Sequence, residues 1–202
     1  MLPLQRRERD AADDPLDVSD VGARLRDLLE RLDEHDGYVR GHGTEVSRVA
    51  ARICRALELP DAEVRDVVLG ALLHDLGKLF IDRRVLAKPA RLTELEWQAI
   101  RLHPTLGVAL LEPGAVREEV VAIIESHHER WDGAGYPHGL AGAEIPLGAR
   151  IVAAADALCA MREPRAYREP LTLDDALSEL DRTAWQQFDG TCVQALIDSV
   201  AA

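Results

Sequence analysis

The sequence predicts an all-α protein. Apolar residues recur every three or four positions through most of the chain, no useful stretch alternates apolar and polar residues as a half-buried strand does, and no internal repeat is present. A chain of 202 residues suits one domain with a sizeable core. Because residues 1–18 are charged and aperiodic, we expect a flexible lead-in over 1–18 and a single helical domain over 19–202.

Helical periodicity gives the elements in order. The first helix is predicted to follow a cap at residues 19–20, and the third to run from Pro60 to Gly77. Residues 79–93 lack periodicity and predict a loop. Residues 131–146 are rich in glycine and proline, so they predict a long ordered loop, a kind of segment that is often functional. The other helices are expected over 46–57, from near 93, 104 and 115, and over 147–161, 174–184 and 191–200.

The charge balance argues against some partners. Lysine and arginine total 24 and aspartate and glutamate total 36, which gives a formal net charge of −12. An acidic surface repels the phosphate backbone of long nucleic acids. No apolar run reaches the roughly 18 residues of a membrane-spanning helix, and the N-terminus has no signal-peptide pattern. Cys54, Cys159 and Cys192 lack a CxxC spacing and indicate reduced core thiols, so the expected location is the cytoplasm.

Histidines and aspartates form a candidate metal site. Two adjacent pairs, His74–Asp75 and His127–His128, lie near the ends of apolar helices. Neighbouring helical residues point about 100° apart, so such a pair serves two nearby ions more easily than one. A single histidine near a helix end is more commonly a capping or surface residue, and the number of these residues is what favours a metal site. The candidate set also includes His42, His103 and Asp156.

Several motifs occur along the chain in a fixed order: Gly41-His42, HDLGK at 74–78, HHERWDGAGYP at 127–137, ARI followed by AD at 149–156, and R.YR at 165–168. Together they resemble the HD-GYP domain family, a branch of the HD phosphohydrolase superfamily, over residues 35–199. The resemblance implies an HD-domain helical bundle with a long ordered GYP loop. It also implies a phosphodiesterase that hydrolyses the bacterial second messenger cyclic di-GMP to linear pGpG or to GMP.

The resemblance further implies roles for individual residues. Asp75 would bridge two divalent metal ions, with Fe or Mn expected first and Ni, Zn or Co as alternatives. A hydroxide that bridges the ions would attack the phosphorus, and Lys78 would neutralise charge that develops on the phosphate. The implied metal ligands are His42, His74, Asp75, His103, His127, His128 and Asp156.

Substrate contacts are implied in the R.YR motif and on the GYP loop. Arg165 and Arg168 match family positions that contact phosphate or guanine, a task that suits a planar guanidinium. Tyr136 and Trp131 can stack on a guanine or simply anchor the loop. The resemblance also implies that this loop docks diguanylate cyclases that carry a GGDEF motif.

Two departures from the family pattern concern the metal site. Tyr38 stands where members with a third metal have a glutamate, so two ions are expected. Cys159 stands where many members have an aspartate, three residues after Asp156. We expect altered surroundings of the metal rather than a lost ligand, because groups behind the ligands tune metal affinity. The alternatives are that the thiol coordinates a soft metal or makes the site sensitive to oxidation.

Other conspicuous residues are predicted to be structural. Glu129, Arg130 and Asp132 are expected to form ion pairs within the GYP loop. Trp97 and Trp185 are expected to be core or packing residues. None of these five is predicted to act on a substrate.

The sequence leaves alternatives open. An HD-type phosphohydrolase of another nucleotide would need the same ligands, since base identity depends on a few polar contacts. A catalytically silent module that binds cyclic di-GMP or a partner would be favoured by the loss of a ligand, and no ligand is lost. The apolar face of the first helix can pack on its own core or on a second subunit, so a homodimer is a further option.

Overall fold

The computed structural model describes residues 22–36, 41–164 and 169–201. These ranges contain no β-strand, only an isolated bridge between Ala184 and Phe188. In chain order the elements are α1 (Ala23–His35), α2 (His42–Ala56), α3 (Asp61–Leu73), the 3₁₀ helix η2 (Leu76–Phe80), α4 (Arg83–Leu86), α5 (Glu94–Ile100), α6 (His103–Ala109), α7 (Glu118–Ser126), the 3₁₀ helix η3 (Gly142–Glu144), α8 (Leu147–Arg162), α9 (Leu173–Thr183) and α10 (Gly190–Ala201).

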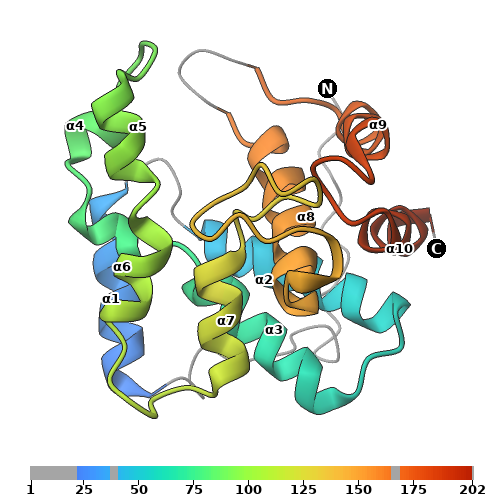
Figure 1. The fold of residues 1–202 in the computed structure, drawn as a ribbon, viewed down its shortest axis with the longest axis horizontal. Helices are drawn as coiled ribbons and strands as arrows, with labels where there is room; N and C mark the ends of the chain where they lie inside the picture. Colours follow the sequence, from blue (N-terminus) through green and yellow to red (C-terminus); the bar gives the residue numbers. More distant parts are fainter. Residues whose placement is uncertain (1–21, 37–40, 165–168, 202) are drawn as a thin grey trace, which may run out of the picture.

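The helices form a central group with a group on either side. In Figure 1, α2, α3 and α7 lie in the middle, α1, α4, α5 and α6 on the left, and α8, α9 and α10 on the right. Contacts between elements agree with this view, because α2 packs on α3, α8 and α10 while η2 packs on α1 and α6. The GYP loop, residues 131–146, connects α7 to α8. Residues from both sides can therefore meet near the central helices.

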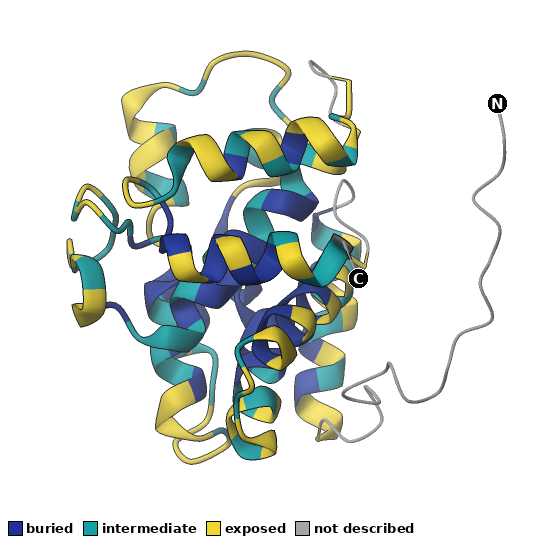
Figure 2. Ribbon diagram, turned by 90° about the vertical axis from the view of Figure 1, so that its right-hand side faces the viewer, coloured by how far each residue is buried: buried dark blue, intermediate teal, exposed yellow. Residues whose placement is uncertain are grey.

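Apolar side chains form two buried clusters. The larger joins α2 and α3 to α8, α9 and α10, with Ile53, Ile151 and Leu196 among its fully buried members. The smaller joins α1 and η2 to α3 and α7, and includes Leu28 and Leu73. Figure 2 shows the buried residues on the inner faces of the helices and the exposed residues on the outer faces. Because α3 and α7 contribute to both clusters, their ends are held firmly in place.

The predicted all-α fold is confirmed, while some predicted boundaries change. α3 ends at Leu73 instead of Gly77, and the chain tightens into η2. α4 and part of η2 occupy the range 79–93 that was expected to be a loop. Such short turns were missed because they span too few residues to show apolar periodicity. The cap expected at residues 19–20 and the lead-in over 1–18 lie outside the described residues.

Two glycines let α7 approach α3 and α8 closely. A Cβ on Gly70 would lie 2.6 Å from Cγ2 of Ile123, and a Cβ on Gly148 would lie 2.5 Å from Cδ1 of the same side chain. Ile123 is buried in α7, about one helical turn before His127. This packing fixes the position of α7, and with it the two histidines that follow the helix.

Local features agree with expectations from the sequence. Thr93 caps α5, since the Glu96 N–H donates to its Oγ1 at 3.3 Å and the Thr93 N–H donates to Oε2 of Glu96 at 2.6 Å. The three cysteines, Cys54, Cys159 and Cys192, are buried and free. Across the described part of the chain, no helix combines the length and apolar character needed to cross a membrane.

Candidate metal centre and substrate pocket

Helix ends and helix starts bring the candidate ligands together. His42 begins α2 and His103 begins α6, while His74 directly follows α3 and His127–His128 directly follow α7. Neighbouring imidazole rings have centroids 4.1–5.4 Å apart. All seven residues predicted as metal ligands lie in this cluster, because α8 adds Asp156 and the start of η2 adds Asp75.

Asp75 lies between two groups of donor atoms. One group consists of His42, His74 and Asp75 itself, and the other of His103, His127 and His128. Oδ2 of Asp75 lies 3.3 Å from Nε2 of His74, and Oδ1 lies 3.4 Å from Nε2 of His103. The two carboxylate oxygens therefore face different groups, as a bridging ligand requires.

Three of the histidines are oriented by a backbone carbonyl that lies three residues earlier in the chain. Nδ1 of His74, of His103 and of His127 lies 2.7, 2.8 and 2.8 Å from the carbonyl oxygen three residues earlier. A carbonyl only accepts hydrogen bonds, so each Nδ1 carries the proton and each Nε2 presents a lone pair. The backbone thus sets both the tautomer and the direction of each ring.

The exposed lone pairs fit a bound cation. Nε2 of His103 and Nε2 of His127 face each other at 3.2 Å, and Nε2 of His74 is buried and has no hydrogen-bond partner among the described residues. Burial lowers the pKa of His103 and, together with nearby His128, that of His127, so both imidazoles are neutral near pH 7. Two bare lone pairs at this distance repel each other unless a cation lies near them. The donor set therefore suits divalent metal ions.

His42 is oriented in a different way, by Glu163. Its Nδ1 lies 2.7 Å from Oε1 of Glu163 at the end of α8. Its Nε2 lies 3.0 Å from Oδ1 of Asp156. Burial lowers the pKa of His42, but the hydrogen bonds to Asp156 and Glu163 outweigh burial and raise it to about 10.

Glu163 was not among the residues predicted from the sequence. One signal was available, because Glu163 lies seven positions after Asp156 and so falls on the same face of α8. A carboxylate that accepts the second N–H of a metal-binding histidine fixes its ring and raises its basicity. Glu163 therefore does for His42 what backbone carbonyls do for the other histidines.

We expect Glu163→Ala to weaken metal binding by roughly 10–100-fold, because the imidazole of His42 loses its anchor. Glu163→Gln should weaken it less, since the amide oxygen still accepts from Nδ1. Chelator competition with Mn(II) measures both constants. Glu118→Gln, a change at an exposed carboxylate on α7, serves as the control. Equal metal affinity in Glu163→Ala and the control would contradict this role.

Asp75 and Lys78 form an ion pair at the edge of the cluster. Nζ of Lys78 donates to Oδ2 of Asp75 at 2.6 Å, and Oδ2 of Asp36 lies 3.9 Å away. Burial alone would raise the pKa of Asp75, but His74 and Lys78 hold it well below its usual range. Burial likewise disfavours the charged form of Lys78, but Asp75 raises the pKa of the ammonium. Both groups are therefore charged at neutral pH.

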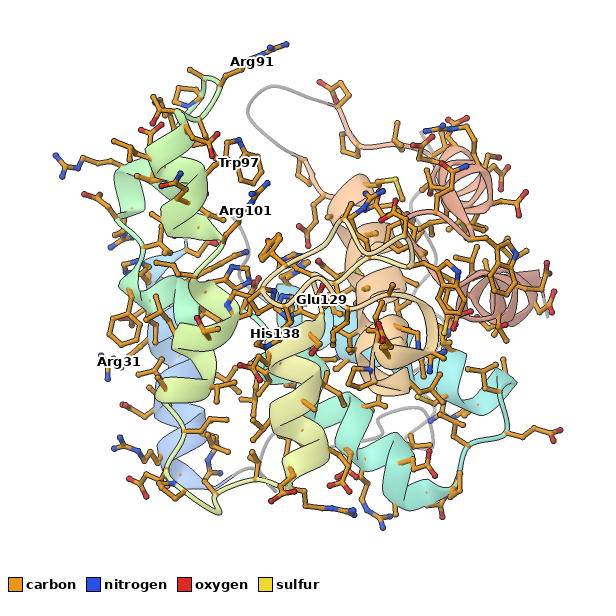
Figure 3. The ribbon with its side chains drawn as sticks, viewed as in Figure 1. Arg31, Arg91, Trp97, Arg101, Glu129 and His138 are labelled. Carbon is orange, nitrogen blue, oxygen red and sulfur yellow. The ribbon has the colours of Figure 1, made fainter. Side chains whose placement is uncertain are left out.

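The GYP loop is held by a buried carboxylate. Glu129 accepts the backbone N–H groups of His138, Gly139 and Leu140 at 2.6, 3.1 and 3.1 Å (Figure 3). The expected ion pair between Arg130 and Asp132 is present at 2.6 Å, but Glu129 is not part of it. Glu129 was expected to form an ion pair within the loop, and this expectation is wrong. Its carboxylate accepts hydrogen bonds from backbone N–H groups, not from a cationic side chain.

Glu129→Ala should destabilise the protein by about 2–4 kcal/mol, because three backbone N–H groups lose a charged acceptor. Urea unfolding of the metal-free chain measures this loss. Glu125→Ala removes a partly exposed carboxylate that pairs with His138 at 3.3 Å, and it should cost less than about 1 kcal/mol. Comparable losses in the two variants would show that the backbone contacts are unimportant.

Tyr136 and Trp131 occupy different surroundings. Tyr136 stacks on His128 with ring centroids 4.8 Å apart and lines the large pocket described below. Trp131 packs edge-on against Trp185 at 5.3 Å, with the guanidinium of Arg150 5.9 Å from its ring. The contacts of Trp131 favour the loop-anchoring option over the stacking option. Trp185, expected to be a packing residue, does pack on Trp131 but is 57% exposed.

A pocket of about 1060 Å³ opens beside the cluster. His42, Asp75, His103 and other predicted ligands form one side of it. Residues 85–92 together with Trp97 form the other side. Trp97 was expected to be a core or packing residue, but it is 45% exposed because α5 is short and buries none of its residues. The pocket is large enough for a ligand bigger than a mononucleotide.

Three predicted residues cannot be placed. Arg165 and Arg168, expected to contact substrate, and Tyr38, expected to limit the site to two ions, lie outside the described residues.

Cys159 is buried on α8, and burial raises the pKa of its thiol. Among the described residues, neither group of donor atoms includes the sulfur of Cys159, which favours the expectation of altered surroundings over direct coordination.

Comparisons with known proteins agree with this geometry. A cyclic di-GMP phosphodiesterase response regulator, RpfG, of Xanthomonas campestris pv. campestris is 41% identical over 186 residues, which cover 89% of this chain and 49% of the relative. The 3'3'-cGAMP-specific phosphodiesterase 3 of Vibrio cholerae is 34% identical over 182 residues, which cover 90% of this chain and 40% of the relative. The chain thus spans about half or less of the length of these relatives.

The fold also matches solved structures. Bd1817, described as a HDG"Y"P protein, from Bdellovibrio bacteriovorus superposes with a TM-score of 0.66 at 21% identity, over 80% of this chain and 52% of that one. This likeness supports the helical architecture expected from the motifs. Residues 25–192 match the family described as HD domain. The chain therefore belongs to the HD domain family.

Proposed function

We propose that this chain is a metal-dependent phosphodiesterase that hydrolyses cyclic di-GMP to pGpG or GMP. The observation that carries the proposal is the convergence of imidazole and carboxylate donors on one side of a pocket of about 1060 Å³. A relative that is 41% identical over most of this chain is named a cyclic di-GMP phosphodiesterase. The site and the relative thus point to the same chemistry.

The proposed site binds two divalent ions. His42, His74 and Asp156 would serve one ion, Asp75 both, and the remaining histidines, His103, His127 and His128, the other. When bound, such ions supply a nucleophilic water at neutral pH and polarise the phosphate. Fe or Mn is the first choice for this donor set, and Ni, Zn or Co is an alternative.

Other side chains would prepare the site for a phosphodiester. The ammonium of Lys78 lines the pocket beside Asp75 and can neutralise negative charge on a phosphate held there. Burial raises the pKa of Tyr136, so its phenol stays protonated and donates a hydrogen bond without repelling an anion. Glu163 keeps the ring of His42 directed at the cluster.

One experiment tests the proposal. The full chain is loaded with Fe(II) or Mn(II) under reducing conditions, and cyclic di-GMP, 3'3'-cGAMP and pGpG are followed by chromatography. We expect turnover of cyclic di-GMP that disappears when a chelator removes the metal and returns when metal is added. A chain shown to hold two ions that turns over none of these compounds would contradict the proposal.

A second candidate substrate is a mixed cyclic dinucleotide. The relative from Vibrio cholerae is named a 3'3'-cGAMP-specific phosphodiesterase and shares the same helical domain with this chain. A kcat/KM higher for 3'3'-cGAMP than for cyclic di-GMP would favour this candidate. The same assay therefore separates the two substrates.

Partners and location remain predictions. A protein with a GGDEF motif could dock on the GYP loop, and the chain could form a homodimer. A cytoplasmic location is supported by the three free, buried cysteines. Co-purification with a diguanylate cyclase and light scattering of the purified chain test the first two.

A further inference from the structure

The side of the pocket opposite the metal-binding residues carries an aromatic ring without a partner. Trp97 lines this side from α5 and is 45% exposed. Within the described ranges its indole takes part in no aromatic or cation–π contact, and its helix has no buried residue. A large apolar ring exposed in a pocket is typical of a ligand-binding surface.

Two arginines are close to Trp97 in the chain. Arg101 follows Trp97 by one helical turn, and Arg91 lines the same pocket. In the described part of the chain neither arginine forms an ion pair, whereas Lys88 on the same side pairs with Glu96 at 2.6 Å. Trp97 and Arg101 project from α5 toward the GYP loop (Figure 3). Arg101 contacts the ring of Tyr136, which lines the pocket, so in a chain with net charge −12 it places a positive charge beside the pocket and favours an anionic ligand.

Arg101 connects this side of the pocket to the metal-binding side. Its guanidinium lies 5.6 Å from the ring centroid of Tyr136, and Tyr136 stacks on His128. The ring of Tyr136 thus already contacts two groups, while the ring of Trp97 remains available. A base would find a free aromatic face on Trp97 more readily than on Tyr136.

We propose that Trp97 and Arg101 form a subsite for the distal nucleotide of a cyclic dinucleotide, the one whose phosphate is not being cleaved. The purine stacks on the indole of Trp97, and Arg101 binds the distal phosphate or the base edge. Tryptophan stacks on any base, and arginine suits both phosphate and base contacts because its fork is planar. This subsite rests on the proposed function and adds the residues that hold the second half of the substrate.

Stacking makes a measurable difference to binding. Replacing an aromatic residue that stacks on a base weakens binding by roughly 5–150-fold. We therefore expect Trp97→Ala to raise the KM for cyclic di-GMP at least about fivefold. Trp97→Phe, which keeps a flat ring, should restore most of the loss. Leu95→Ala, at a side chain that is 77% exposed on α5 and does not line the pocket, should leave the KM unchanged.

The subsite predicts selectivity as well as affinity. The ratio of kcat/KM for cyclic di-GMP to kcat/KM for methyl p-nitrophenyl phosphate, a diester without a second nucleotide, should fall in Trp97→Ala. Calorimetry of pGpG with the metal-free full chain gives a reading that does not depend on catalysis. Trp97→Ala should weaken this binding, and Leu95→Ala should not.

The two proposals fail in different ways. Turnover of cyclic di-GMP with the same KM in wild type and Trp97→Ala overturns the subsite but leaves the proposed function standing. Absence of turnover in the wild type overturns the proposed function, and pGpG binding then decides about the subsite alone. If pGpG binds equally to wild type and Trp97→Ala, the indole does not hold a base, and its exposure fits a protein partner instead.

Discussion

Asp75→Asn is expected to lower the turnover of cyclic di-GMP by at least about a thousandfold, because it removes the carboxylate that faces both groups of donors. Its two oxygens lie 3.3 and 3.4 Å from Nε2 of His74 and of His103, and an amide offers only one oxygen in their place. The neutral amide also removes the 2.6 Å ion pair with Lys78. Steady-state kinetics and metal analysis measure the loss.

A matched control separates the bridge from a general effect of charge. Asp181→Asn removes one negative charge from an exposed position on α9 and should leave turnover and metal content unchanged. In Asp75→Asn we expect the metal content to fall below that of the wild type. A variant that keeps two ions and wild-type turnover would show that Asp75 is not the bridge, and the proposed mechanism would then be wrong.

The sequence predicts the candidate metal ligands better than the residues that orient them. His74, His127 and His128 were found as candidate ligands because they occupy the ends of recognisable apolar helices. His42 and His103 begin helices instead and were included because they match motifs of the chain. Glu163 was missed because its partner His42 lies 121 positions earlier, a contact that only the packing of α2 on α8 creates. Local periodicity carries no information about such a pair.

The burial of Trp97 was predicted wrongly for a related reason. Apolar residues in a helix normally indicate the face that enters the core, but α5 has only 7 residues and none of them is buried. The region 79–93 was likewise expected to be a loop, since η2 and α4 are too short to produce a periodic pattern. The long helices and the starts of α5 and α6 could be predicted, and the shorter elements η2 and α4 could not.

Gly77→Ala should be the most destabilising of the proposed substitutions, although it adds one methyl group. A Cβ on Gly77 would lie 1.9 Å from the carbonyl oxygen of His103 and 2.6 Å from the backbone nitrogen of Gly107. These atoms belong to the backbone of α6, so no side-chain rotation can relieve the overlap. We expect a loss of about 3 kcal/mol or more, at the upper end of overpacking effects, which corresponds to a Tm lower by roughly 6–12 °C.

The same overlap links the stability of the fold to the metal site. To accommodate the methyl group, η2 and α6 must move apart, and this motion separates Asp75 from His103. Gly107→Ala is the matched control, because its Cβ would approach the same contact from α6 with a nearest atom at 3.2 Å and should be tolerated far better. Thermal unfolding with and without Mn(II) tests both effects. Equal Tm values for the two variants would show that the glycine in the HDLGK motif is not required by this close approach.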